Sequence, residues 1–197
     1  MLYSFLRAII QVLFSLFGLK TEGLHNIAEK GPLILAANHV SYWDAIVVAA
    51  AVKRPIHYMG KAELFDYPLL GFFIKKLNAF PVRRGIADRN AIKKALLVLE
   101  EGKILGIFPE GMRNLKGEDL KAQAGVAMIA LKSGVPVVPV ACIGTKRILP
   151  LGWFRPLVVR VGDPIGLEEY QGQKVNSAAM EKLSSEIMTK INLLLEK

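Results

Sequence analysis

Apolar and polar positions follow two rhythms along this chain, one typical of buried strands and the other of amphipathic helices. Short apolar runs bounded by Gly or Pro predict buried strands at residues 33–37, 104–108 and 135–141, and weaker strand patterns lie at 56–59, 79–82 and 157–161. Helical patterns fall between them, at 41–52, 68–77, 88–101, 123–133 and 177–195. The alternation predicts a single α/β domain whose sheet is mainly parallel, with some mixed pairing, and is flanked by helices.

The first 19 residues, MLYSFLRAIIQVLFSLFGL, form the most apolar segment. Their few polar or small positions recur every three or four residues, which makes one narrow polar stripe on a helix. We expect an amphipathic helix that lies in the interface of a bilayer, because Arg7 and Gln11 disfavour a lipid-embedded span. No small-residue cleavage site follows Leu19, which argues against a signal peptide. A helix packed on the domain core is the remaining alternative. The predicted organisation is thus a membrane helix at 1–19 and a domain at 20–197.

The composition limits the partners and the metal or disulfide chemistry that we expect of this chain. A hydrophobic content of 52% is high for 197 residues, and the mean hydropathy is +0.35. The formal net charge is +9, and residues 53–94 supply +7 of it, with ten Lys or Arg against three acids. Such a patch favours an anionic partner, either a phosphate or an anionic bilayer surface. Because the chain has only one cysteine and three histidines, we expect neither an intrachain disulfide nor a dedicated metal site.

Candidate catalytic residues directly follow the strand predicted at 33–37, in the segment NHVSYWD at 38–44. His39 and Asp44 would lie on different faces of a continuous helix, so they meet only if His39 lies on the turn and Asp44 on the first helical turn. Ser41 is a good N-cap, and Asp44 then occupies the position of a capping-box acid. Asp44 could therefore serve only as a cap, or it could orient the His39 imidazole as a general base. Spacing alone does not decide between the two.

Further charged candidates follow other predicted strands. Glu110, Gly111 and Arg113 come after the strand at 104–108, where Gly111 permits a sharp turn and Arg113 could clamp a phosphate. Their alternative role is a surface ion pair. Three more cations in the basic stretch could bind an anionic substrate or be solvated charges: Lys61, Arg83 and Arg84. Pro136 and Pro139 in the strand at 135–141 predict a sheet edge or a bulge.

Four segments, taken in this order, resemble the 1-acylglycerol-3-phosphate acyltransferase family over residues 20–145. The family's first block, N-H-x-S-x-x-D, is matched by Asn38, His39, Ser41 and Asp44. Its second, around K-x-E-L and a later aromatic-x-x-R, is matched by Lys61, Glu63, Leu64, Phe80 and Arg83. Its third, F-P-E-G-T-R, is matched by Phe108, Pro109, Glu110, Gly111 and Arg113. Its fourth, V-P-x-x-P-V, is matched by Val135, Pro136, Pro139 and Val140. Met112 departs from the usual Thr or Ser of the third block and removes a hydroxyl there.

The resemblance implies transfer of a fatty acyl group from acyl-CoA or acyl carrier protein to the 2-hydroxyl of 1-acylglycerol 3-phosphate (lysophosphatidate), giving phosphatidate. It implies that His39 is the base and that Asp44 orients it. Lys61 and Arg113 would bind the phosphate, supported by Arg83 or Arg84, and Glu110 would position the glycerol. No metal or cofactor is implied beyond the acyl donor. Membrane lipids would be the partners, on the cytoplasmic face of the cell membrane.

Three alternatives remain at this stage. The acceptor could be glycerol 3-phosphate or another lyso-lipid. An esterase or thioesterase with Ser41 as nucleophile lacks a G-x-S-x-G motif in the sequence. A non-enzymatic membrane-binding or nucleic-acid-binding module would also explain the charge, but aromatic residues are not interleaved with the basic stretch as base stacking requires, so we expect no nucleic-acid partner.

Overall fold

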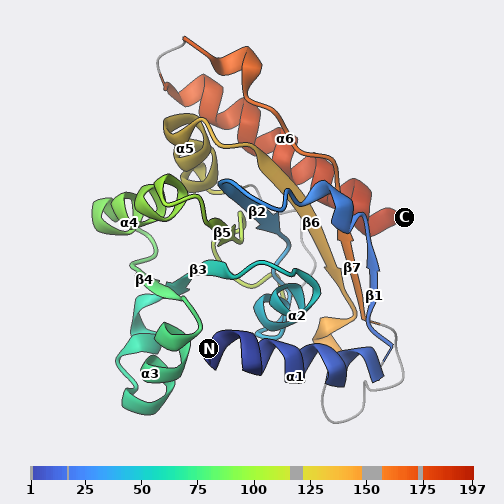
Figure 1. Ribbon diagram of the computed structural model, residues 1–197. Coiled ribbons are helices and arrows are strands. Elements are labelled where there is room, and N and C mark those ends of the chain that lie inside the picture. The colour runs from blue at the N-terminus through green and yellow to red at the C-terminus, as the bar shows by residue number, and fades with distance from the viewer. Residues whose placement is uncertain (1, 17, 116–121, 148–156, 173–174) are drawn as a thin grey trace.

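A seven-stranded mixed sheet forms the centre of the protein in the computed structural model (Figure 1). The structure describes residues 2–16, 18–115, 122–147, 157–172 and 175–197. The strands are β1 (Lys20–Glu22), β2 (Leu33–Ala37), β3 (Ile56–Lys61), β4 (Phe80–Val82), β5 (Ile104–Ile107), β6 (Val137–Ile143) and β7 (Val158–Val161), in the order β1-β7-β6-β2-β5-β3-β4. Neighbours are parallel except for the antiparallel pair β6–β7. The prediction of an α/β domain with a mainly parallel sheet is confirmed.

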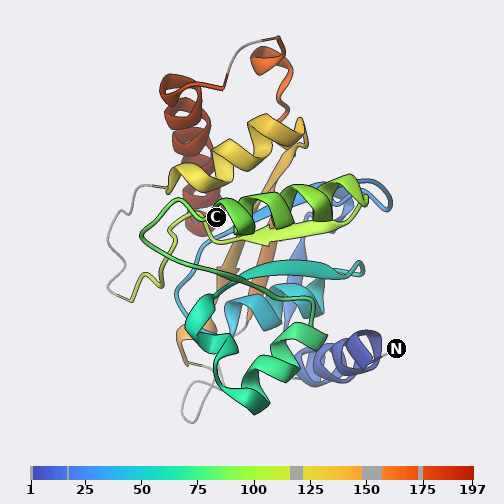
Figure 2. The same ribbon diagram turned by 90° about the vertical axis from the view of Figure 1, so that its left-hand side faces the viewer.

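Helices cover both faces of this sheet, so its central strands are apolar on both sides (Figures 1 and 2). In β2, Ile34 and Ala36 face the core shared with α4 (Arg89–Glu100), α5 (Ala124–Ser133) and α6 (Ser177–Glu196). Leu33 and Leu35 face the opposite core, which contains α2 (Asp44–Ala51) and Phe14 of α1 (Leu2–Leu16). α3 (Pro68–Lys76) lies beyond the edge formed by β4. Each predicted helix is present within a few residues of its expected bounds.

One strand is not predicted by the sequence, and one of the two alternatives predicted for another strand is excluded. β1, with the sequence Lys-Thr-Glu, was not expected because it has no apolar residue and is exposed on both faces. β6 is not an edge strand, since it lies between β7 and β2. The antiparallel register between β6 and residues 158–165 nevertheless shifts by one residue between the pairs Val137–Ile165 and Val140–Val161. This shift is a bulge. Pro139 lies at this irregularity, where its missing N–H breaks no regular ladder.

The N-terminal helix α1 packs on the domain along one face. Phe14 is buried against Trp43 in an edge-to-face contact. Arg7, one of the predicted polar-stripe residues, donates from Nε to the carbonyl of Val52 at 2.7 Å, and the Tyr3 hydroxyl accepts from the Ile56 N–H at 3.2 Å. Arg7 and Tyr3 therefore anchor the helix to the end of α2 and the start of β3, while much of its apolar surface is exposed. Among the described residues, no helix combines the length and apolar character needed to cross a membrane.

Candidate active site

The turn between β2 and α2 brings His39 and Asp44 together. Nδ1 of His39 lies 3.0 Å from Oδ2 of Asp44, and the same oxygen accepts from the Val40 and Ser41 N–H groups at 2.7 Å each. Asp44 is fully buried as the first residue of α2, where the helix dipole favours a carboxylate. His39 thus lies on the turn after the strand and Asp44 at the start of the helix, as the spacing required. The predicted N-cap at Ser41 is wrong, because α2 begins at Asp44 with Trp43 at the N-cap position and no side-chain cap. Asp44 nevertheless accepts from two N–H groups of the preceding turn and also contacts the imidazole, so a structural role and a role beside His39 do not exclude each other.

This geometry fixes the tautomer of His39. A carboxylate only accepts, so Nδ1 carries the proton that points to Asp44, and Nε2 is left as the basic nitrogen. The imidazole stacks on the Phe108 ring, with centroids 4.0 Å apart and an interplanar angle of 16°. His39 is buried except for 8% of its surface, and it lines a cavity. The imidazole is therefore held in one orientation at the cavity wall.

The loop after β5 holds the backbone of His39. Glu110 Oε1 accepts from the His39 N–H at 2.8 Å, and the Asn114 N–H donates to the His39 carbonyl at 2.6 Å. Gly111 turns this loop with φ +70°, in the left-handed region that glycine tolerates. Burial raises the pKa of Glu110, and the His39 N–H opposes that shift. The structure therefore places Glu110, 4% exposed, beneath the His39 turn and not in the cavity lining.

Asn38 fastens the other side of the turn. Its Nδ2 donates to the Cys142 carbonyl at 3.0 Å, and its Oδ1 accepts from the Cys142 N–H at 2.7 Å. This pair of bonds joins the carboxyl end of β2 to β6. Burial raises the pKa of the Cys142 thiol well above its ordinary value, so it stays protonated and is no nucleophile.

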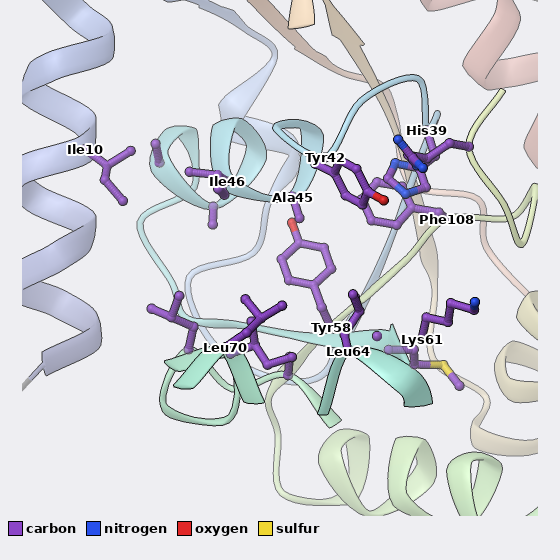
Figure 3. Close-up of a pocket in the computed structure, with 18 of the residues that line it drawn as sticks. Ile10, His39, Tyr42, Ala45, Ile46, Tyr58, Lys61, Leu64, Leu70 and Phe108 are labelled. Carbon is purple, nitrogen blue, oxygen red and sulfur yellow. The ribbon is translucent and has the colours of Figure 1, made fainter. Parts of the chain in front are cut away.

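The cavity beside His39 has a volume of about 870 Å³ and is mostly lined by apolar side chains of α1, α2, β3 and α3. In Figure 3, His39 and Lys61 lie at one end, and Ile10, Ile46 and Leu70 lie at the other. Tyr58 lies between the ends and stacks on Phe108 with centroids 5.8 Å apart. The cavity thus combines a basic nitrogen with an extended apolar compartment.

Cations gather at the His39 end of the cavity. Lys61, Arg84 and Arg113 all belong to its lining. Lys61 pairs with Glu63 at 3.0 Å, and the Arg113 guanidinium lies 3.7 Å above the centroid of the Tyr42 ring. Partial burial is the main cause that lowers the pKa of Arg84. The Glu63 carboxylate raises this pKa and the Arg113 guanidinium lowers it, so Glu63 and Arg113 are both close to Arg84. A phosphate would fit the chemistry of this group.

Other residues singled out in the sequence lie outside the cavity lining. Arg83 is exposed beyond β4, and Phe80 is buried in the core shared with α4 to α6. Pro136 precedes β6 at the opposite end of the sheet, where its carbonyl accepts from Ile34. Ser41 accepts at Oγ from the Trp43 N–H at 3.3 Å, a weak local bond. These residues support packing and local geometry.

Thr145 was missed by the sequence analysis. Its hydroxyl donates to Oδ1 of Asp44, and the residue is 1% exposed. It lies 101 positions beyond Asp44, in the short 3-10 helix after β6, so no local spacing could reveal the contact. Among the described residues, no cluster of three or more His, Cys, Asp or Glu could hold a metal ion.

Comparisons with known proteins agree with this geometry. A family model described as Acyltransferase matches residues 18–143. A 1-acyl-sn-glycerol-3-phosphate acyltransferase from Bacillus subtilis is 32% identical over 166 residues, covering 83% of this chain and 82% of the relative. A lyso-ornithine lipid O-acyltransferase from Pseudomonas aeruginosa is 38% identical over 116 residues, covering 58% of this chain and 44% of the relative. The crystal structure of the 1-acyl-sn-glycerophosphate acyltransferase PlsC from Thermotoga maritima superposes with a TM-score of 0.74 at 26% identity, covering 99% of this chain and 82% of that one.

The family model covers well over half of the chain, and its matched residues contain the His39–Asp44 turn, the cationic end of the cavity and the loop that holds His39. The chain is therefore an acyltransferase and belongs to the family that includes the 1-acyl-sn-glycerol-3-phosphate acyltransferases.

Proposed function

We propose that this enzyme transfers a fatty acyl group from an acyl thioester, carried by CoA or acyl carrier protein, to the 2-hydroxyl of 1-acylglycerol 3-phosphate. The product is phosphatidate, a precursor of membrane phospholipids. The observation that carries the proposal is the oriented His39 imidazole on the wall of a cavity that is apolar along most of its length and cationic at the His39 end. The names of several relatives point to the same acceptor.

In the proposed reaction, Nε2 of His39 removes the proton of the acceptor hydroxyl as its oxygen attacks the thioester carbonyl carbon. A C–O bond forms and the C–S bond breaks. The thiolate leaves and receives the proton from the imidazolium. Asp44 stabilises the imidazolium through Nδ1, at the 3.0 Å contact already present in the structure. A thioester is already activated, so these residues supply a complete base-catalysed route.

Substrate binding follows from the two ends of the cavity. Lys61, Arg84 and Arg113 would bind the acceptor phosphate, and the apolar compartment would hold an acyl chain. Because the acceptor is a membrane lipid, we place the enzyme on the cytoplasmic face of the cell membrane, as a peripheral or monotopic protein anchored by α1. The exposed apolar side chains of α1 support this placement.

A second acceptor class is favoured by two observations. The Pseudomonas aeruginosa relative, at 38% identity, is named for a lyso-ornithine lipid and not for a phosphate ester. Met112, which replaces the usual Thr or Ser, lines the cavity beside Arg113 and brings an apolar side chain there. Acylation of another lyso-lipid is therefore the alternative function.

A panel assay tests the proposal. Purified protein in detergent is given acyl-CoA or acyl carrier protein thioesters with lysophosphatidate, lyso-ornithine lipid or glycerol 3-phosphate. Lysophosphatidate should be converted fastest, and the product should carry the new chain at the 2-position. Faster conversion of lyso-ornithine lipid would establish the alternative, and thioester hydrolysis without acceptor acylation would contradict both.

A further inference from the structure

Two helices that border the cavity each expose an apolar face. In α1 the exposed face contains Ile9, Val12, Leu13 and Leu16, of which Leu16 is 77% exposed. In α3 it contains Leu69, Phe72 and Phe73, of which Leu69 is 72% exposed. Both sets recur at helical spacings of three and four, so each forms a continuous face. Exposed apolar surface of this extent marks an interaction site.

The same helices turn other residues inward. Leu6 and Ile10 of α1 line one wall of the cavity, and Leu70 and Ile74 of α3 line another. Gly71 seats α3 on the preceding 3-10 helix, because an added Cβ would lie 2.6 Å from the Phe65 carbonyl oxygen. The outward apolar faces are thus positioned by inward contacts and are continuous with the acyl compartment.

Both helices lie at the same end of the molecule, the end away from α5 (Figures 1 and 2). Neither helix contains an acidic residue, and α3 ends in Lys75 and Lys76. Nζ of Lys76 lies 5.7 Å from the centroid of the Phe72 ring, so this lysine borders the apolar face with its charge at the margin. Aromatic and aliphatic side chains edged by lysines match the boundary between acyl chains and anionic headgroups.

We infer that α3 is a second membrane-docking helix, which inserts Leu69, Phe72 and Phe73 into the same leaflet as α1, with Lys75 and Lys76 at anionic lipid headgroups. The inference rests on the proposed function for the identity of the lipid that enters the cavity. Docking through both helices places the cavity walls at the level of the acyl chains, so an acyl chain reaches His39 from the leaflet without crossing water.

Binding to vesicles of phosphatidylcholine, with and without phosphatidylglycerol, tests this inference. The variant L69Q/F72Q/F73Q changes exposed residues that do not line the cavity. Its matched control, L97Q/L193Q/L195Q, changes three exposed leucines of α4 and α6. The α3 variant should bind vesicles about tenfold or more weakly, and the control should bind as the parent does. K75E/K76E should lose the preference for vesicles that contain phosphatidylglycerol.

Activity toward a short-chain lysophosphatidate in free solution separates this inference from the proposed function. The α3 variant should keep that activity and lose activity toward acceptor embedded in vesicles. Parent-like vesicle binding by the α3 variant would overturn the inference. The inference would also be overturned if the parent were a dimer in solution and the α3 variant a monomer with unchanged vesicle binding. A parent that binds vesicles but acylates no lysophosphatidate would instead refute the proposed function.

Discussion

Residues 38–44 are held from several sides, whereas α1 and α3 are each held along one face and expose the other. N–H groups of the His39 turn donate to the carboxylates of Asp44 and Glu110, the Asn114 N–H donates to the His39 carbonyl, and Asn38 binds the turn to β6. The two helices contact the domain through Phe14, Arg7 and Gly71 and present apolar side chains outward. A residue proposed as a base must be held in one orientation, while a helix proposed to face lipid needs only an exposed apolar surface. Substitutions in the two regions should therefore have different effects.

Among the residues that support His39, the largest effect is expected for Asp44→Asn. An asparagine has one acceptor oxygen in place of two, so it cannot accept from the Val40 and Ser41 N–H groups and from the Thr145 hydroxyl at once, and it has no charge to stabilise an imidazolium. Turnover should fall by about a hundredfold or more. Unfolding should become easier by about 1–3 kcal/mol, more than loss of a simple cap. Enzyme kinetics and denaturant unfolding measure the two effects, and a stability loss with normal turnover would restrict Asp44 to capping.

A smaller loss is expected for Thr145→Val, which keeps the side-chain shape and removes the hydroxyl. Asp44 Oδ1 would lose its donor, so the carboxylate would hold the imidazole less well. We expect kcat to fall by about tenfold with little change in KM. Thr145→Ser should restore activity, and Thr145→Val should add little in an Asp44→Asn background. Equal losses in both backgrounds would mean that Thr145 acts on the fold and not through Asp44.

Adjacent arginines offer a comparison at the mouth of the cavity. Arg84 lines the cavity, but Arg83 does not. Arg84→Ala should raise KM for lysophosphatidate by about tenfold, because a charge-assisted contact with the phosphate is lost. Arg83→Ala should leave KM within about twofold, because Arg83 is not part of the cavity lining. Steady-state kinetics with varied acceptor measures both, and equal effects would show that the lining cations do not select the phosphate.

The smallest effect is expected for Ser41→Ala. Ser41 matches the first block of the family, yet its hydroxyl makes only a 3.3 Å bond to the Trp43 N–H. Loss of that bond should cost about 0.5–1 kcal/mol of stability, with turnover nearly unchanged. Thermal unfolding and an activity assay provide the measurement. A large loss of turnover would assign Ser41 a role that its position does not suggest.

Much of the fold and part of the site could be predicted from the sequence, because they depend on local patterns. The continuous apolar run of β2 is a signal of this kind. The spacing of His39 and Asp44 also gave their meeting point. Thr145 and the role of Glu110 beneath His39 depend on strand order, which brings together residues that are far apart in the chain. The exposed face of α3 could not be predicted either, since its apolar residues resemble those of a buried helix until the packing is known.

The proposed reaction depends most directly on Nε2 of His39 as the base for acyl transfer. The most direct measurement compares phosphatidate formation from lysophosphatidate and an acyl thioester by the parent and by His39→Ala, alongside the thermal unfolding of both proteins. Transfer should fall by about a thousandfold or more in His39→Ala, with an unfolding midpoint close to that of the parent. Near-normal transfer by a folded His39→Ala protein would contradict this role of His39.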